Sequence, residues 1–329
     1  MIAAPFHLAR PRSVEEAVGT LTEHGAEAMI VAGGTDVIPN LQMRLFSPRV
    51  LVDLKPLRML RGLSFSEPDG LRIGALTTLA EVLAAPVVRE RFSVLAQAVA
   101  TIAGPLQRNM GTLGGNLCLE TRCRWYNQSH FWRQALGGCL KKDGPVCHVA
   151  PGGKFCWAAW SSDSAPALLV LDAEIEIAGS GGLRRLPLRE FYKNDGMDRI
   201  ALGRGEILTA VLVPARMAGL RGAYHKLRVR DSIDYPLAGV AVAMEVDGQG
   251  VCRDARIALT AVNPAPVLVR QAGEWLVGRR WNPVLAEETA HAAIQTGKPL
   301  TTSASTPVYR REMVKLFTRR ALEETWGRR

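Results

Sequence analysis

The chain has 329 residues, of which 47% are hydrophobic and 22% charged. This is the composition of a globular protein long enough for two or three domains, each with its own core. No run approaches the roughly 20 apolar residues that a transmembrane helix needs. The N-terminus also lacks the basic and apolar segments of a secretory signal. We therefore expect a cytoplasmic protein without a membrane segment, whose cysteines are not paired in structural disulfides.

The formal net charge is +10, from 41 basic and 31 acidic residues. A basic protein has to be considered as a nucleic-acid binder. However, the basic residues are scattered, with small clusters only at 226–230, at 279–280 and at the C-terminus. No basic stripe is interleaved with aromatic residues. The pattern favours a solvated surface, with a subunit interface as a further use of the charge, and predicts no nucleic-acid binding.

The first 55 residues alternate between helical and strand patterns. Ser13 followed by Glu16 predicts a helix N-terminus with a capping box, and Gly25 is placed to end that helix. Apolar runs over 28–32 and 50–54 predict strands, with a glycine turn and a second helical segment between them. This alternation predicts a small α/β subdomain over residues 1–55.

Two further units follow. Residues 56–180 begin with a strand over 71–75, a helix capped by Thr77 or Thr78 and a longer helix over 87–102. A glycine-rich loop, a cysteine-rich segment (118–160), a helical stretch over 165–171 and a strand over 173–177 complete this unit. Residues 181–329 predict an α+β domain, with strands over 206–213, 223–229 and 238–246 and with helices around 274, over 284–295 and over 308–325.

Glycine-rich turns occur at residues 33–35 and 111–116. Free backbone amides at such turns favour phosphate groups, although a single loop of this kind is more often a tight turn. Neither turn has the G-x-G-x-x-G or Walker A pattern. Two loops around one α/β unit favour a dinucleotide site. Asp163 can reach a ribose hydroxyl or cap a helix. Lys226, Asp234 and Tyr235 can contact a flavin ring or form surface pairs.

Residues 118–160 contain five of the six cysteines and four of the seven tryptophans. Cys123, Cys139, Cys147 and Cys156 are separated by 15, 7 and 8 residues. The absence of a C-x-x-C pair counts against a zinc ribbon or knuckle. The closely spaced cysteines of bacterial ferredoxins are also absent. The spacings therefore leave both an iron–sulfur cluster and another kind of zinc site open. Isolated buried thiols are a third possibility, but the loops between them have the composition of surface loops. Cys118 is a fifth candidate ligand.

No catalytic constellation is evident elsewhere. The sequence has no Ser/His/Asp order and no paired-carboxylate signature that would indicate hydrolytic chemistry. His148, beside Cys147, is expected to form a hydrogen bond rather than to ligate a metal. The residues themselves therefore offer no candidate catalytic site.

Three segments resemble the FAD-binding medium subunits of the xanthine oxidase family of molybdenum enzymes: 31–36, 111–116 and 162–167. The resemblance implies an α+β fold with a two-part FAD-binding domain of the vanillyl-alcohol-oxidase (PCMH) type, followed by a carbon monoxide dehydrogenase flavoprotein-type C-terminal domain. It also implies that Asp163 lies near the FAD ribose and Lys226 near the flavin. The residues implied for the FAD diphosphate are Val31, Ala32, Gly33, Gly34, Thr35, Asp36, Gly111, Thr112, Gly114, Gly115 and Asn116.

The cysteine-rich segment resembles an insertion in the β subunits of 4-hydroxybenzoyl-CoA reductases. That resemblance implies a [4Fe–4S] cluster on Cys123, Cys139, Cys147 and Cys156, with Cys118 outside the ligand set. It further implies a molybdopterin-containing large subunit and a small subunit with two [2Fe–2S] clusters, in a dimer of heterotrimers. Ferredoxin would supply electrons, which the [4Fe–4S] cluster and FAD would relay toward molybdenum for the reductive dehydroxylation to benzoyl-CoA.

Three alternatives stay open. The first is a medium FAD subunit of a related enzyme that acts on another aromatic or N-heteroaromatic ring, or that runs electrons in the opposite direction. The second, from another class, is a zinc-stabilised binding module. The third, a free-standing flavin oxidase, is disfavoured because no substrate-facing base is evident.

Overall fold

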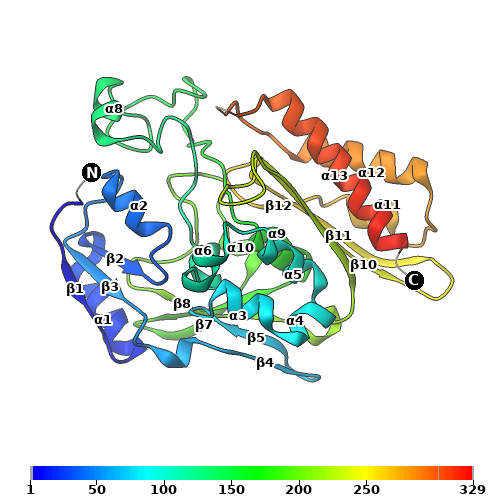
Figure 1. Cartoon of the computed structure of the whole chain (residues 1–329), viewed down its shortest axis with the longest axis horizontal. Coiled ribbons are helices and arrows are strands. Elements are labelled where there is room, and N and C mark those ends of the chain that lie inside the picture. Colours follow the sequence, from blue (N-terminus) through cyan, green and yellow to red (C-terminus); the bar gives the residue numbers. More distant parts are fainter. Residues whose placement is uncertain (1–2, 303, 328–329) are drawn as a thin grey trace.

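The computed structural model describes residues 3–302 and 304–327. At the N-terminal end (blue in Figure 1), three short strands form a parallel sheet in the order β1-β3-β2. Its elements are β1 (His7–Ala9), α1 (Val14–His24), β2 (Ala28–Val31), α2 (Val37–Gln42) and β3 (Val50–Asp53). The Ser13 hydroxyl accepts a hydrogen bond from the Glu16 amide, and Gly25 ends α1 with φ of +50°. The strands and helices expected for this subdomain are therefore present.

The second unit is built on an antiparallel sheet in the order β4-β5-β8-β6-β7. Its strands are β4 (Leu63–Ser66), β5 (Gly70–Gly74), β6 (Glu174–Gly179), β7 (Gly182–Pro187) and β8 (Ile207–Val213). The sheet buries apolar side chains against a group of short helices, which together form the largest core of the molecule. The expected domain boundary after residue 180 falls between β6 and β7, which are neighbours in this sheet.

The helices of this unit are short. They are α3 (Leu79–Ala84), α4 (Pro86–Arg91), α5 (Ser93–Ala100), α6 (Pro105–Met110), α7 (Leu113–Leu117), α9 (Ser164–Val170) and α10 (Leu188–Phe191). The single helix expected over 87–102 is wrong. The chain leaves helical geometry at Phe92, with φ of −132° and ψ of 52°. The Phe92 side chain is almost fully buried, so tertiary packing breaks a segment whose apolar pattern is continuous.

The C-terminal unit is a four-stranded antiparallel sheet with helices over one face (Figure 1). Its strands are β9 (Arg221–Leu227), β10 (Ala238–Val246), β11 (Cys252–Thr260) and β12 (Val267–Leu268). Helices α11 (Ala272–Leu276), α12 (Pro283–Thr296) and α13 (Pro307–Gly327) complete it. Helices α5 and α9 of the second unit contact β9, β10 and β11, so the two units share an extensive interface. Strand β11 was not expected from the sequence.

The cysteine-rich segment leaves the body after α7 and returns just before α9. It projects as a series of turns with one helix, α8 (His130–Ala135), near α2 (Figure 1). Arg122 and Ala159 exchange two backbone hydrogen bonds of 2.8 and 2.7 Å that close its base. The buried Arg133 donates to the carbonyl oxygens of Met43 and Arg44, which fastens the segment to the end of α2.

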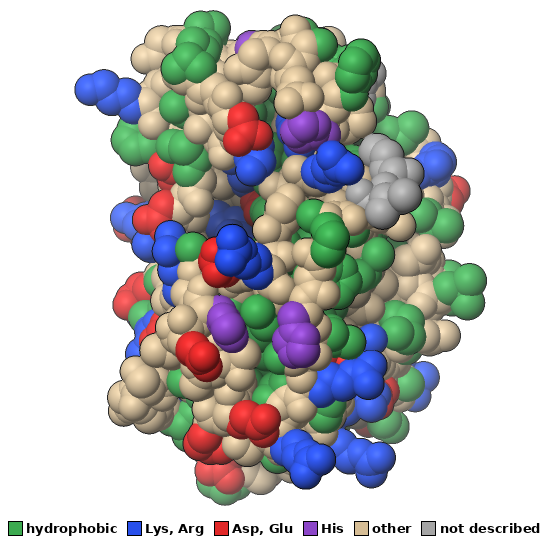
Figure 2. Space-filling model, turned by 90° about the vertical axis from the view of Figure 1, so that its left-hand side faces the viewer, with side chains coloured by type: hydrophobic (Ala, Val, Ile, Leu, Met, Phe, Trp, Pro, Cys, Tyr) green, Lys and Arg blue, Asp and Glu red, His purple; other side chains and the backbone are tan. Residues whose placement is uncertain are grey.

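On the face shown in Figure 2, lysine and arginine side chains are interspersed with acidic ones, and neither sign forms a large patch there. Within residues 3–302 and 304–327, no helix has both the length and the apolar character needed to cross a membrane.

Candidate functional site

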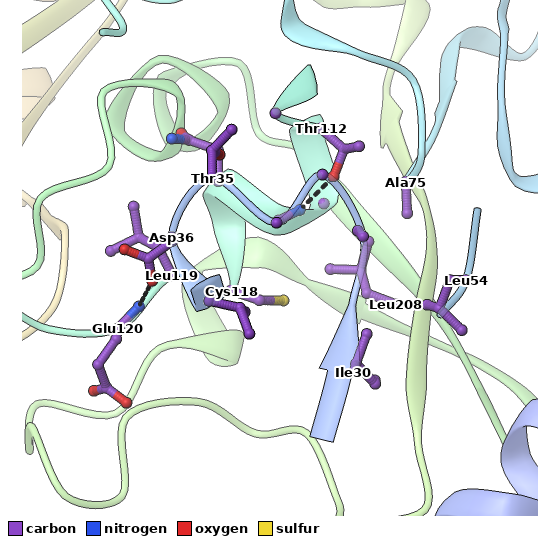
Figure 3. Close-up of a pocket in the computed structure, with 18 of the residues that line it drawn as sticks. Ile30, Thr35, Asp36, Leu54, Ala75, Thr112, Cys118, Leu119, Glu120 and Leu208 are labelled. Atoms are coloured by element: carbon purple, nitrogen blue, oxygen red, sulfur yellow. Dashed lines mark hydrogen bonds between the residues drawn. The ribbon is translucent and has the colours of Figure 1, made fainter. Parts of the chain in front are cut away.

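A cavity of about 530 Å³ lies where the N-terminal sheet meets the second unit. Both glycine-rich loops form part of its wall, and the loop between β9 and β10 contributes Ile233, Asp234 and Tyr235. Figure 3 shows side chains from the two units converging on it, with Ile30, Leu54 and Leu208 on an apolar side and Thr35, Asp36 and Glu120 on a polar side. The cavity therefore offers apolar surface at one end and polar groups at the other, which suits an elongated cofactor.

The two glycine-rich loops touch each other through their backbones. A Cβ atom on Gly33 would lie 2.0 Å from the carbonyl oxygen of Met110 and 2.8 Å from the Cα atom of Gly111. Only glycine fits at position 33, because any side chain would force the loops apart. The following residue, Gly34, has φ of +77°, which glycine adopts without strain. The two glycines therefore let the backbones of the two loops meet closely at the cavity wall.

The second loop is held from both sides. The Thr112 hydroxyl accepts a hydrogen bond from the Gly115 amide at 3.1 Å, as Figure 3 shows, and the Gly114 amide donates to the Ala75 carbonyl at 2.9 Å. The Asn116 side-chain oxygen accepts hydrogen bonds from the hydroxyls of Ser162 and Ser164 at 2.7 and 2.6 Å. Residues far apart in the sequence, 111–116 and 162–164, are therefore locked into one wall.

Asp163 lines the cavity and is 3% exposed. Its carboxylate accepts hydrogen bonds from the Tyr224 hydroxyl at 2.6 Å and the Lys226 ammonium at 3.0 Å. Burial raises the pKa of Asp163, and the charge of Lys226 offsets part of that effect. Lys226 does not line the cavity. Its other hydrogen bonds go to the carbonyls of Thr101 and Asp234, so it supports Asp163 from behind.

Asp36 is also occupied by protein groups. Its carboxylate is paired with the Arg122 guanidinium and accepts hydrogen bonds from the Tyr235 hydroxyl at 3.2 Å and the Glu120 amide at 3.3 Å. The Arg122 guanidinium lies 4.3 Å from the centre of the Tyr235 ring. Asp36 therefore ties the first glycine loop to the base of the cysteine-rich segment and to the β9–β10 loop.

Eleven of the thirteen residues expected at the cofactor are on the cavity wall. Val31 is instead buried in β2, and Lys226 lies behind Asp163. The wall residues are Ala32, Gly33, Gly34, Thr35, Asp36, Gly111, Thr112, Gly114, Gly115, Asn116 and Asp163. Their contact with a cofactor remains a prediction. Cys118, Glu120, Arg199 and Tyr235 also line the cavity. Tyr235 is one of the residues that the sequence offers as a flavin contact or a surface pair. Sequence patterns do not single out Cys118, Glu120 and Arg199 for the cavity, because long-range folding brings them there.

The six cysteines are all free thiols. Cys123 accepts hydrogen bonds from the backbone amides of Trp125 and Tyr126, and Cys156 from that of Ala158. Cys123 is near enough to Cys139 and to Cys147 for their charges to interact, and Cys156 is near enough to Cys147. Burial raises the pKa of Cys156 to about 11, although its amide hydrogen bond acts in the opposite direction.

Within the described ranges, no three His, Cys, Asp or Glu side chains are placed to hold a metal ion. The expected iron–sulfur site is therefore not demonstrated by the structure, and a zinc site fits no better. Cys118 lines the cavity, with its side chain directed toward it in Figure 3. Burial raises the pKa of its thiol to about 12. His148 is hydrogen-bonded to the Gly138 carbonyl at 2.6 Å, in line with the expected hydrogen-bonding role.

Comparisons with known proteins cover the whole chain. Residues 4–216 match the family of the FAD binding domain in molybdopterin dehydrogenase, and residues 222–325 match the CO dehydrogenase flavoprotein C-terminal domain. The carbon monoxide dehydrogenase medium chain of Hydrogenophaga pseudoflava is 30% identical over 331 residues, which cover 100% of this chain and 99% of the relative. A putative xanthine dehydrogenase FAD-binding subunit of Escherichia coli K12 is 26% identical, over 98% and 95% of the two chains.

Solved structures agree with the sequence comparisons. A chain of the Cu,Mo-CO dehydrogenase superposes with a TM-score of 0.82 at 28% identity and 100% coverage of both chains. A chain of quinoline 2-oxidoreductase from Pseudomonas putida 86 gives 0.79 at 26% identity, with 99% coverage of both. The chain is thus an FAD-binding medium subunit of the xanthine oxidase family of molybdenum enzymes.

Proposed function

We propose that the cavity holds FAD, with the diphosphate at the junction of residues 32–36 and 111–116. The contact between Gly33 and Met110 carries this proposal, because it leaves the wall without side chains and lets a phosphate approach backbone amides. Asp163, fixed by Tyr224 and Lys226, presents a carboxylate that suits a ribose hydroxyl. FAD supplies the redox chemistry, and the protein binds and orients it.

We infer that residues 118–160 hold a [4Fe–4S] cluster on Cys123, Cys139, Cys147 and Cys156. Several observations support this. None of the four thiols forms a disulfide. Cys123 is near enough to Cys139 and Cys147, and Cys156 to Cys147, for their charges to interact. Backbone amides also donate hydrogen bonds to the sulfurs of Cys123 and Cys156. Hydrogen bonds to ligating sulfurs are among the features that tune such clusters. A cubane also keeps its ligands further apart than one ion does, since four irons and four sulfides fill the centre.

We further propose that the chain serves a 4-hydroxybenzoyl-CoA reductase, as the resemblance of residues 118–160 indicates. In that assembly it would join a molybdopterin-containing large subunit and a [2Fe–2S] small subunit in a dimer of heterotrimers. Ferredoxin would be the electron donor. The chain would pass electrons between its redox groups and contribute no residue that touches the aromatic substrate.

A second candidate is a medium FAD subunit serving an enzyme with another substrate. The nicotinate dehydrogenase FAD-subunit of Eubacterium barkeri, 27% identical over 94% of this chain, favours it. Because a flavin subunit does not contact the substrate, the two candidates share everything described for the cavity. They differ in the iron and sulfide bound by the cysteine-rich segment.

Anaerobic purification of the complex, with quantitation of flavin, iron and acid-labile sulfide, tests the proposal. We expect one FAD per chain and, on exchange of Cys139 for serine, loss of the four irons and four sulfides of one [4Fe–4S] cluster. The matched control is Cys118→Ser, which removes a partly buried thiol outside the four and is expected to leave iron unchanged. Equal iron content in both variants would refute the cluster assignment. Turnover of aromatic CoA esters by the isolated chain would refute the role as a subunit without catalytic residues.

A further inference from the structure

A buried network of charged side chains joins the cysteine-rich segment to the cavity. Lys141 comes from the segment, and its ammonium is paired with the Glu120 carboxylate. The side chains of Lys141 and Glu120 are 8% and 6% exposed. Arg199 lies 3.9 Å from the same carboxylate oxygen, and Glu120 and Arg199 both line the cavity. One anion between two cations leaves this network with a net positive charge.

The Lys141 ammonium is fixed in place rather than free to move. Besides Glu120, it donates to the Thr121 hydroxyl and, at 2.7 Å, to the Gly196 carbonyl. It also lies 4.6 Å from the centre of the Tyr126 ring. These contacts use all three protons of the ammonium group. A buried charge held this tightly exerts a stronger field than a mobile charge in water.

This charge is linked to the surroundings of one cysteine sulfur, that of Cys156, through Gly196. Gly196, which accepts from Lys141, donates its own amide to the Cys156 carbonyl at 2.8 Å. A Cβ atom on Gly196 would be 2.8 Å from the Cys156 sulfur, so the sulfur contacts this glycine directly. Lys141 thus connects the surroundings of the Cys156 sulfur, through Gly196, to Glu120 on the cavity wall.

We propose that Lys141 sets the reduction potential of the redox centre held by the four cysteines, and that Glu120 counterbalances it from the flavin side. The inference rests on the proposed [4Fe–4S] site. Reduction adds negative charge to the centre, so a fixed cation nearby stabilises the reduced form and raises the potential. A neighbouring anion has the opposite effect. Lys141 acts through the field it imposes and is a positioning residue, not a ligand.

The test is a redox titration of the purified complex, followed by the EPR signal of the reduced cluster. Lys141→Met is expected to lower the equilibrium constant for reduction by about tenfold or more, equivalent to about 59 mV for one electron. Glu120→Gln is expected to shift the potential upward. The double variant, which removes one charge of each sign, is expected to lie between the two single variants. Iron and sulfide content is measured in every sample.

Lys142→Met is the matched control, because it removes the same charge one residue away. The Lys142 side chain is 36% exposed and its partner Asp143 is 60% exposed, so solvent screens this pair. We expect a much smaller shift from it. Equal shifts from Lys141→Met and Lys142→Met, or shifts of the same sign from Lys141→Met and Glu120→Gln, would overturn the inference. A wild-type complex without the iron and sulfide of the [4Fe–4S] cluster would instead refute the proposed function on which it rests.

Discussion

The contact between the two glycine loops predicts a large effect of a single methyl group. In Gly33→Ala, the new Cβ would meet the Met110 carbonyl oxygen at 2.0 Å, far inside van der Waals contact. Both partners are backbone, so relief requires moving one loop away from the other. Overpacking of this kind costs typically about 1–3 kcal/mol. Since the same loops form the proposed diphosphate site, we expect FAD affinity to fall by roughly ten- to a hundredfold, the binding equivalent of about 1.4–2.7 kcal/mol.

Flavin titration by fluorescence quenching measures the affinity, and urea unfolding of the apoprotein measures stability. Gly19→Ala is the matched control, because Gly19 lies in the interior of α1 and a methyl group there would meet nothing within 4 Å. At that position the same change is expected to stabilise by about 0.5–1 kcal/mol and to leave FAD binding unchanged. Wild-type flavin affinity in Gly33→Ala would refute the assignment of this junction to the cofactor.

Three other substitutions test separate parts of the molecule. Cys139→Ser is expected to lose iron and sulfide but to keep FAD, because the two sites use different segments; loss of flavin at unchanged iron content would contradict this. Lys226→Met leaves Asp163 buried without its cation and is expected to destabilise by about 3–5 kcal/mol in urea unfolding, whereas the exposed Lys193→Met changes stability by about 1 kcal/mol or less. Burial lowers the pKa of His225 in the folded state. His225 therefore binds a proton more readily in the unfolded chain, so its contribution to stability is lost as the pH falls below about 6.5. His225→Phe should therefore make the urea unfolding midpoint depend less on pH between pH 7.5 and 5. An unchanged pH dependence of the midpoint would refute the assignment.

The glycine loops were predictable from sequence because their signal is local. A strand, a Gly-Gly-Thr turn and a helix follow one another over 28–42, so the free amides have to lie at one end of the strand. The position of Asp163 before a helix was equally readable, and α9 begins at the next residue. What no local pattern contains is the partner of each group. Asp163 is held by Tyr224 and Lys226, about sixty residues later in the chain.

The same limit applies to Tyr235, which the sequence offers as a flavin contact or a surface pair without giving its partner. Tyr235 reaches Asp36 across 199 positions of the sequence, from a loop whose course depends on the packing of β9 and β10. The break at Phe92 has the same origin, because helix propensity alone would continue through it. Lys141 looked like part of a surface loop beside Lys142, yet it is buried by Glu120 and Tyr126. Composition describes the average environment of such a loop and not that of one side chain.

Covalent geometry places two of the four cysteines near the cavity however the loops between them fold. Glu120 lines the cavity, and Cys123 follows three residues later, so their Cα atoms are at most about 11 Å apart. At the other end, Cys156 precedes Ser161, also on the wall, by five residues, or at most about 18 Å. The backbone pairing of Arg122 with Ala159 holds these two ends together. A redox centre that used both cysteines would therefore be tethered from two directions close to the cavity in which we propose that FAD binds.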